Sequence, residues 1–261
     1  MKNKVAIFGS GLSALYAYAA CVDNGVEAEF FSDKPFEAKP EFFGPVKLSW
    51  IPPRIKATLY PVWLFSLGNK ADYLTRMGRN SGHTTFPENG REETLAYNPS
   101  EVSDLMQPVN AKIVLGRFTD GEIEKLSHEY LHTFVTFPLQ QSKSEDRLVS
   151  YWIYLLKNQN SLSLPNMVIY NGVKDFSWTR FSHYWNSYMW EFSHLEFPNL
   201  PPRPSIWAEP KQIFDIAPNV PEYRSPFSNV TLLGRWARWS KSVLAQDAYS
   251  QVDKILKELF K

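Results

Sequence analysis

A short apolar segment that runs directly into two glycines constrains the fold of this chain more than any other feature. Residues 5–8 read Val-Ala-Ile-Phe, and a run that is apolar throughout predicts a strand buried on both faces of a parallel sheet. Residues 9–14 read Gly-Ser-Gly-Leu-Ser-Ala, and the alanine-rich residues 12–22 predict a helix. A second predicted strand over residues 26–31 is closely followed by Asp33. This order of strand, glycine turn, helix and strand predicts the start of a parallel α/β sheet.

The same residues have the pattern of a dinucleotide-binding turn. Gly9 would allow the tight turn, Gly11 would let the backbone approach a pyrophosphate, and Ala14 is small enough for the helix to pack on the strand. The helix N-terminus would offer N–H groups and partial positive charge to the phosphates. Asp33 could bind ribose hydroxyls, although Ser32 occupies the position where the acid most often falls. The alternative is a strand-to-helix turn that merely needs small residues.

Composition limits the class of protein. A chain of 261 residues allows one large domain, or one domain with a small insertion, and the hydrophobic fraction of 44% can fill a core. The net charge of +1 gives no reason to expect nucleic-acid binding. The single cysteine, Cys21, excludes an internal disulfide and favours a reducing, cytoplasmic location. We expect no signal peptide and no membrane span, because no apolar run approaches the roughly 20 residues that a bilayer needs.

A metal site is not expected. His128 and His132 are four residues apart, which on a helix would place two ligands on one face. His132, however, begins a predicted strand, and no third ligand is evident. The sequence therefore predicts no bound metal.

Hydrophobic patterns predict further elements along the chain. Strands are predicted over residues 55–65, 109–115, 131–137, 148–156, 167–170 and 229–233. Helices are predicted over residues 70–77 and 241–260. Residues 78–100 are polar and are predicted as a loop. The aromatic and proline-rich region after residue 170 shows no clear period.

The first and last predicted elements both have the order strand, glycine turn, helix. We therefore expect the two ends of the chain to share one α/β domain, a Rossmann-like nucleotide-binding domain of parallel sheet and helices formed by residues 1–50, 109–140 and 225–261. Residues 51–108 and 141–224 would form a small inserted α+β region that covers the ligand.

Five short blocks occur in order along nearly the whole chain. They are the glycine turn at 9–14, Gly-Pro-Val-Lys-Leu-Ser-Trp at 44–50, Thr-Phe-Pro-Leu at 136–139, Val-Ile-Tyr-Asn-Gly-Val-Lys-Asp at 168–175, and Gly-Arg-Trp-Ala-Arg-Trp at 234–239. Together they resemble the FAD-dependent amine-oxidase-like superfamily, and within it UDP-galactopyranose mutase most closely. The mutase segment Gly-Pro-His-x-Phe-His-Thr has two histidines that this chain replaces with Val46 and Ser49.

The resemblance implies that the Rossmann-like domain is an FAD-binding domain, with an FAD site built from several parts of the chain. Its expected cofactor-binding residues are Gly9, Gly11, Leu12 and Ser13 at the pyrophosphate, Asp33 at the ribose, Val114 at the adenine, Gly44 and Pro45 beside the isoalloxazine, Arg235 near the flavin or an anionic substrate group, and Ser242, Val243 and Leu244 at the start of the last helix, with N–H groups directed at the flavin pyrimidine.

Candidate substrate and catalytic residues follow from side-chain chemistry. Arg180 and Arg235 could hold an anionic group in a bidentate fork. Lys47 could orient water near flavin N5, as the resemblance implies. Four tryptophans could stack on flavin, a base or a sugar, namely Trp50, Trp178, Trp236 and Trp239. Hydrogen bonds to a sugar or a ring could come from Tyr170 and Asn171. The alternatives are an ion pair for Arg180, a loop lysine, a strand-end turn for Tyr170 and Asn171, and core packing for each tryptophan.

Three functions remain open at this point. The first is an FAD-dependent oxidoreductase that transfers a hydride from a small or nucleotide-like substrate to flavin N5. The second is mutase-like, non-redox chemistry on a nucleotide sugar, against which the missing histidines count. The third is a flavin- or nucleotide-binding protein without catalysis. The sequence does not predict the oligomeric state.

Overall fold

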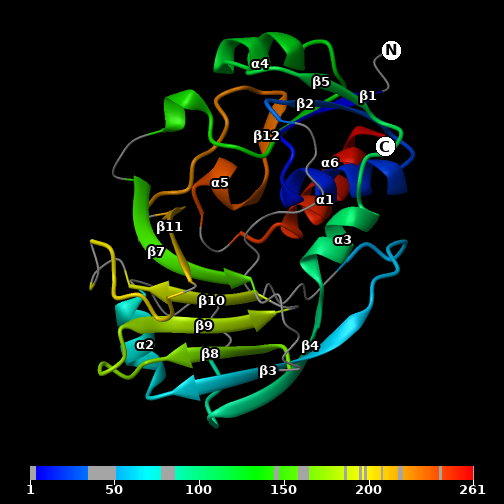
Figure 1. Ribbon diagram of the computed structural model, residues 1–261. Helices are drawn as coiled ribbons and strands as arrows, with labels where there is room; N and C mark the ends of the chain where they lie inside the picture. The colour runs from blue at the N-terminus through cyan, green and yellow to red at the C-terminus, as the bar shows by residue number, and fades with distance from the viewer. Residues whose placement is uncertain are drawn as a thin grey trace.

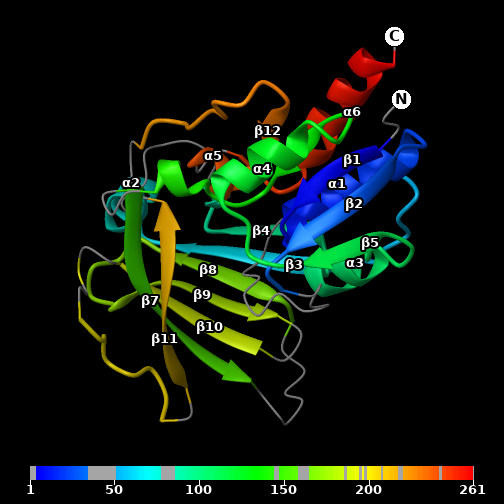
Figure 2. The same cartoon turned by 90° about the horizontal axis from the view of Figure 1, so that it is seen from above.

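The chain forms two β-sheets, with helices on both faces of the first. The computed structural model describes residues 4–34, 51–77, 86–143, 147–157, 165–184, 187–193, 196, 199–206, 208–216, 220–240 and 243–260. Figure 1 shows the first sheet and its helices above the second sheet, with both chain ends on the side of the first. In Figure 2 the two sheets lie side by side.

The first sheet is parallel throughout and has the strand order β12-β6-β1-β2-β5. Its strands are β1 (Lys4–Phe8), β2 (Glu27–Ser32), β5 (Lys112–Leu115), β6 (Thr133–Val135) and β12 (Val230–Leu232). Val5 to Phe8 of the central strand are fully buried, as the unbroken apolar run predicts for a strand covered on both faces.

Helices cover both faces of the parallel sheet. On one face α1 (Leu12–Asp23) packs beside α6 (Asp247–Leu259), and α3 (Pro99–Leu105) joins the same core. The other face carries α4 (Asp120–Ser127), whose Ile123 packs with Phe8 and Val135. Two hydrogen bonds tie α1 to α6: Asn24 Nδ2 donates to Asp253 Oδ1 at 3.0 Å, and Tyr249 OH donates to Asp23 Oδ2 at 2.8 Å.

A charged cluster lies at the amino ends of the parallel strands. Glu29 is 2% exposed and accepts hydrogen bonds from Lys4 and Tyr130, and it pairs with Lys112. Burial opposes its ionisation, but the hydrogen bonds from Lys112, Lys4 and Tyr130 outweigh burial and lower the pKa of Glu29 to about 2. This carboxylate therefore stays ionised at neutral pH.

The second sheet is mixed and has the strand order β11-β7-β10-β9-β8-β3-β4. Its strands are β3 (Leu59–Leu67), β4 (Arg91–Tyr97), β7 (Leu148–Lys157), β8 (Met167–Asn171), β9 (Trp178–Tyr184), β10 (Ser187–Phe192) and β11 (Glu209–Ile216). Only the β3–β8 pair is parallel among these described strands. Helix α2 (Lys70–Arg76) packs on one face through Tyr73, against Val168 and Tyr170.

Two short helices complete the set of elements. The 3-10 turn η1 (Gln140–Ser142) follows β6, and α5 (Gly234–Arg238) follows β12. None of the helices in the described ranges has the length and apolarity that crossing a bilayer requires.

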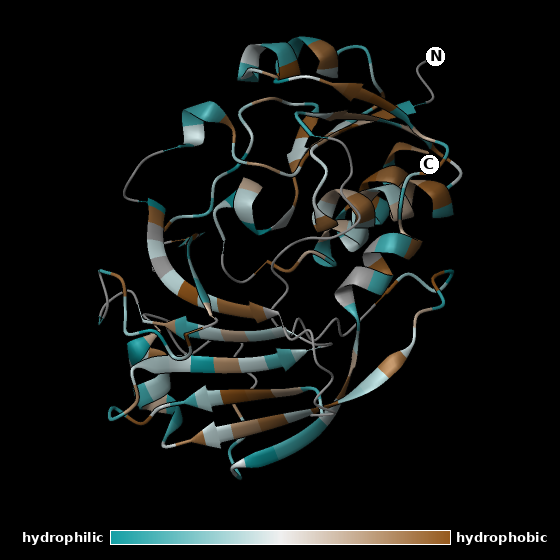
Figure 3. Cartoon of the chain, in the orientation of Figure 1, coloured by the Kyte–Doolittle hydropathy of each residue, from teal (hydrophilic) through white to brown (hydrophobic). Residues whose placement is uncertain are grey.

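The loop predicted over residues 78–100 is wrong at its C-terminal end, which contains β4. Residues 91–94 read Arg-Glu-Glu-Thr, and this strand lies at the edge of the sheet, where charged side chains are common. Figure 3 shows β4 as largely hydrophilic. Ala96 is the one buried residue of β4, so the strand carries too little hydrophobic pattern to detect. Residues 78–85 lie outside the described residues.

The predicted start of the last helix is also wrong, because α6 begins at Asp247 and not at residue 241. The N–H groups of Asp247, Ala248 and Tyr249 each bond to the carbonyl three residues earlier, so the chain enters the helix through successive tight turns. The Asp247 carboxylate accepts the N–H of Leu244 at 2.8 Å and holds these turns.

The predicted fold class is confirmed: a parallel α/β sheet with helices, plus a second region of α+β type. The second region contributes the larger of the two sheets. The predicted boundaries between the regions stay a prediction. Ile55, Val102 and Met106, which the prediction placed in the insertion, pack in the core of the parallel sheet.

Candidate functional site

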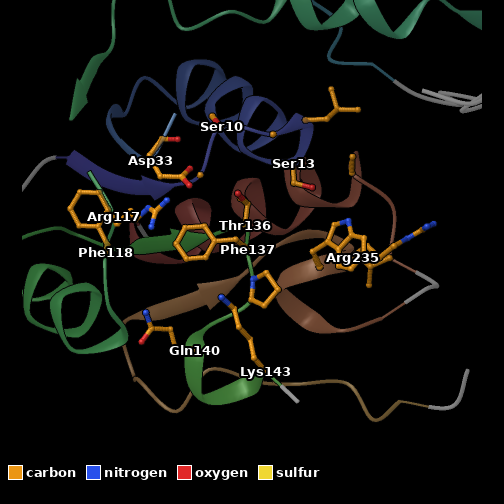
Figure 4. A pocket seen from close by; sticks show the side chains of 18 of the residues that line it. Ser10, Ser13, Asp33, Arg117, Phe118, Thr136, Phe137, Gln140, Lys143 and Arg235 are labelled. Carbon is orange, nitrogen blue, oxygen red and sulfur yellow. The ribbon is translucent and has the colours of Figure 1, made fainter. Parts of the chain in front are cut away.

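A cleft with a volume of about 880 Å³ opens at the carboxyl ends of the parallel strands. It is lined by residues that follow each strand of the sheet: Gly9, Ser10, Gly11, Leu12 and Ser13 after β1; Ser32 and Asp33 at β2; Gly116, Arg117 and Phe118 after β5; Thr136, Phe137, Pro138, Gln140 and Lys143 after β6; and Arg235, Trp236, Val243, Leu244 and Ala245 after β12. Figure 4 shows these side chains around the cleft.

The strand order explains why the cleft lies there. From β1 the chain builds β2 and β5 on one side, and β6 and β12 on the other. The loops that leave β1 and β6 therefore run in opposite directions and leave a crevice at the carboxyl edge. Ligands of open parallel sheets bind at such a switch point.

The first glycine of the turn is fixed by its backbone and its neighbour. Gly9 has φ +114°, a conformation that side chains with a Cβ rarely adopt, and a Cβ there would overlap Thr136 Oγ1. Thr136 is held in place because both its hydroxyl and its N–H donate to the Phe8 carbonyl, each at 3.0 Å. The turn thus depends on contact between the ends of β1 and β6.

The second glycine faces the cleft. Gly11 has an extended backbone and is the N-cap of α1, and a Cβ built on it would meet no atom within 4 Å. Within the described part of the chain, the N–H groups of Leu12 and Ser13 have no acceptor, and both residues line the cleft. Two free donors at a helix N-terminus, with open space beside them, form an anion-binding end.

The two ends of the chain meet beside this helix. Gly234 has φ +79°, and a Cβ on it would overlap Ser13 Oγ and stand 2.9 Å from Ser13 Cβ. Residues 9–13 consequently line one cavity together with Arg235, Trp236 and residues 243–245. The expectation that the N- and C-terminal blocks share one domain agrees with this contact.

Charged side chains around the cleft are mostly basic. Arg117, Lys143 and Arg235 come from three different segments, whereas Asp33 is the one acid among the described lining residues. Arg235 Nη1 lies 3.9 Å from Asp215 Oδ1 on β11, so this arginine also links the two sheets. Three cations against one carboxylate favour an anionic ligand.

The part of the cleft formed by residues after β12 is apolar. Trp236 and Leu244 are 37% and 39% exposed and line it with Val243 and Ala245. Because the Leu244 N–H is bound to Asp247, it is not free to face a ligand. This segment offers apolar surface where the sequence predicted helix N–H groups.

Eight of the predicted cofactor-binding residues lie together in the cleft: Gly9, Gly11, Leu12, Ser13, Asp33, Arg235, Val243 and Leu244. Val114 lies on β5 and packs toward α4, two residues before the cleft-lining Gly116. The predicted residues Gly44, Pro45, Lys47, Trp50 and Ser242 lie outside the described residues. All of these cofactor-binding roles stay predictions.

The predicted substrate-binding residues of the mixed sheet are not brought to this cleft. Arg180 Nε donates to Glu191 Oε1 at 2.7 Å, and Glu191 is 2% exposed. Burial alone would lower the pKa of Arg180, but the Glu191 charge outweighs it and raises the pKa. Tyr170 is buried in the core under α2. Asn171 donates to the Trp178 carbonyl and accepts the Val173 N–H, as a turn residue does.

Trp239 is a core residue in this structure. It is 2% exposed, its Nε1–H donates to Ser142 Oγ at 2.9 Å, and it has φ +53° at the end of α5. This bond fixes η1, and with it the segment that carries Gln140 and Lys143, against α5. Trp239 therefore supports the wall of the cleft without lining it.

Sequence reasoning missed several lining residues, among them Arg117, Phe118, Gln140 and Lys143. Arg117 and Phe118 could have been found, since they follow a strand that was predicted to end at residue 115. Lys143 could not, because its position depends on η1 and on the contact with Trp239.

No protein-family model and no curated protein sequence matches the chain. Solved structures are similar in fold. The flavin-dependent brominase Bmp2 matches with a TM-score of 0.52 and 11% identity, covering 100% of this chain and 80% of its own. A geranylgeranyl bacteriochlorophyll reductase-like protein from Thermoplasma acidophilum matches with a TM-score of 0.55 and 8% identity, covering 98% and 77%.

A third similar structure is the peptidyl tryptophan dihydroxylase QhpG, with a TM-score of 0.52, 8% identity, and coverage of 100% of this chain and 68% of its own. Identities this low show a common fold and no more. The chain thus has a fold that is also found in flavin-dependent enzymes. The closer resemblance to UDP-galactopyranose mutase stays a prediction.

Proposed function

We propose that this chain is an FAD-dependent oxidoreductase that transfers a hydride from a small or nucleotide-like substrate to flavin N5. The observation that carries the proposal is a cleft at the carboxyl edge of the parallel sheet that residues 9–13 share with Arg235, Trp236 and residues 243–245. Its volume of about 880 Å³ is in the range of ligand pockets, and its shape joins a polar end to an apolar one.

The described residues fit the parts of a dinucleotide. The free N–H groups of Leu12 and Ser13 would hold the pyrophosphate, and the open space at Gly11 lets it approach. The Asp33 carboxylate would accept hydrogen bonds from the ribose. The exposed apolar surface of Trp236 and Leu244 would cover a planar ring.

Bound flavin supplies a hydride acceptor, which no side chain of the chain can replace. The remaining tasks belong to the protein. Arg235, held by Asp215, would place a positive charge near the ring or an anionic substrate group. The mixed sheet would hold the substrate and exclude water.

The mutase-like alternative needs arginines for the diphosphate of a nucleotide sugar. Arg180 is paired with Glu191 in the mixed sheet, which leaves Arg235 for that role among the predicted residues. The residues that stand in place of the mutase histidines, Val46 and Ser49, cannot take over imidazole chemistry. We therefore place the oxidoreductase first.

A binding experiment tests the proposal. The purified chain should take up FAD and show flavin absorbance, with binding measured by calorimetric titration. Gly11→Val places a side chain into the open space and should weaken FAD binding at least about tenfold, because the pyrophosphate loses its approach to the α1 N-terminus.

Gly121→Val is the matched control. Gly121 lies on α4, and its Cβ position is also open, but it does not line the cleft. Its variant should bind FAD as the parent does. Failure of the parent chain to bind FAD would refute the proposal. Anaerobic bleaching of bound flavin by an amine or alcohol would show the redox reaction, whereas activity with a UDP-sugar only after dithionite reduction would favour the mutase-like alternative.

A further inference from the structure

An arginine that the FAD prediction did not use lies at the Asp33 end of the cleft. Arg117 follows β5, the edge strand beside β2. The Gly116 N–H donates to the Ser32 carbonyl at 2.9 Å, so the ends of the two strands are tied together. Figure 4 shows Asp33, Arg117 and Phe118 close together at one end, with Arg235 at the opposite end.

The next residue fixes the local backbone. The Phe118 ring packs edge-on against Phe8 at 5.3 Å and against Phe31 at 5.5 Å between ring centroids, and those two rings stack at 4.7 Å. A Cβ on Gly116 would stand 3.3 Å from the Phe118 ring, which leaves little room for the segment to move. Arg117 thus projects from a fixed corner of the cleft.

The guanidinium of Arg117 is uncommitted. Arg117 is exposed, and its guanidinium has no hydrogen-bond or ion-pair partner among the described residues. Arg235, also in the cleft, has Asp215 close by, and Arg54 outside the cleft pairs with Asp23. A planar cation without a partner, on the wall of an anion-binding cleft, is available to a ligand.

We propose that Arg117 stacks on the adenine of the bound dinucleotide and so makes the site select FAD over FMN. This inference rests on the proposed FAD function. With the pyrophosphate at the α1 N-terminus and the ribose at Asp33, the adenine would extend toward β2 and β5, where Arg117 lies. A flat guanidinium favours the face of an aromatic ring, and a purine offers one.

Calorimetric titrations with FAD, FMN and ADP test this assignment. Arg117→Ala should weaken the binding of FAD and ADP by about 5- to 20-fold. This is the loss expected for a cation–π contact that is between fully exposed and partly desolvated. FMN binding should not change, because FMN has no adenine. Arg117→Lys should recover only a small part of the loss, since an ammonium keeps the charge but not the flat face.

Arg224→Ala serves as the control, because Arg224 is exposed and does not line the cleft. It should bind all three ligands as the parent does. The loss in Arg117→Ala should also persist at about 0.5 M salt, where interactions between exposed charges are largely screened. An unchanged urea midpoint would show that the variants fold.

Four results would overturn the inference. Equal weakening of FMN and FAD, or full rescue by Arg117→Lys, would make Arg117 a phosphate-binding charge. Unchanged FAD and ADP binding in Arg117→Ala would remove it from the site while leaving the proposed function in place. If the parent chain binds neither FAD nor ADP, the proposed function fails and the inference fails with it.

Discussion

The contact between Gly234 and Ser13 provides a direct test of how the two ends of the chain meet. Replacing Gly234 with Ala introduces two costs. A side chain at φ +79° costs about 1–2 kcal/mol in backbone strain. The new methyl group would also overlap Ser13 Oγ and stand 2.9 Å from Ser13 Cβ, and such overpacking costs about 1–3 kcal/mol. We therefore expect Gly234→Ala to lower the free energy of unfolding by about 2–5 kcal/mol, the sum of these two terms.

Two further variants separate the strain from the overlap. Gly90 has φ +77°, and its Cβ position is open, so Gly90→Ala should show only the strain of about 1–2 kcal/mol. Ser13→Gly removes both overlapped atoms at a cost of about 0.5 kcal/mol in helix propensity. Combined with Gly234→Ala, it should recover about 1–3 kcal/mol, the overlap term.

Urea denaturation followed by tryptophan fluorescence would give the free energies of unfolding from midpoint and slope. If Gly234→Ala costs no more than Gly90→Ala, or if the Ser13 and Gly234 changes are simply additive, the two ends do not touch as described. The shared cleft would then lose its structural basis.

Two other predictions concern buried charges away from the cleft. The pKa of Glu29, about 2 against an ordinary 4.5, means that its stabilising contribution is present above pH 4.5 and is lost as the pH falls toward 2. Glu29→Gln should thus lower the free energy of unfolding by about 1–2 kcal/mol at pH 7 and by almost nothing near pH 2. The cost is smaller than the full pKa shift corresponds to, because Lys4 and Lys112 are partly exposed. Urea midpoints measured against pH check this, with Glu27→Gln at an exposed position as the control. Arg180→Met should cost about 3–5 kcal/mol by leaving the Glu191 carboxylate buried without its partner, and Arg180→Met with Glu191→Leu should cost less than that single change. Loss of turnover in Arg180→Met with unchanged stability would instead support a substrate-binding role.

The parts of the fold that could be predicted are those with local causes. The apolar residues 5–8, the glycines that follow and the alanine-rich helix determine their own conformation, and β1 and α1 have the expected places. The mixed sheet was harder to predict. Strands β9, β10 and β11 were missed because aromatic and polar side chains alternate there irregularly, with a register shift between Glu191 and Phe192.

The residues of the site likewise divide into those with local causes, which could be predicted, and those that depend on long-range contacts, which could not. The residues of the glycine turn, Asp33 and Arg235 follow strand ends, and a sequence pattern can mark a strand end. Lys143 and Gln140 reach the cleft through η1, which depends on a long-range bond from Trp239 to Ser142. Arg180 has the right chemistry for an anion, but its neighbour Glu191 becomes known only once β9 and β10 are paired.

The interleaving of the two sheets has a consequence for how the protein is made. The glycine turn leaves the ribosome long before its counterparts β12, α5 and α6, which emerge only after more than two hundred further residues. Until then Leu15 and Ala19 of α1 lack the cover of Val252 and Leu256, and the apolar surface stays open to chaperones or to other nascent chains. A ligand that contacts both sides of the cleft can therefore stabilise the fold only after residues 235, 236 and 243–245 have been made.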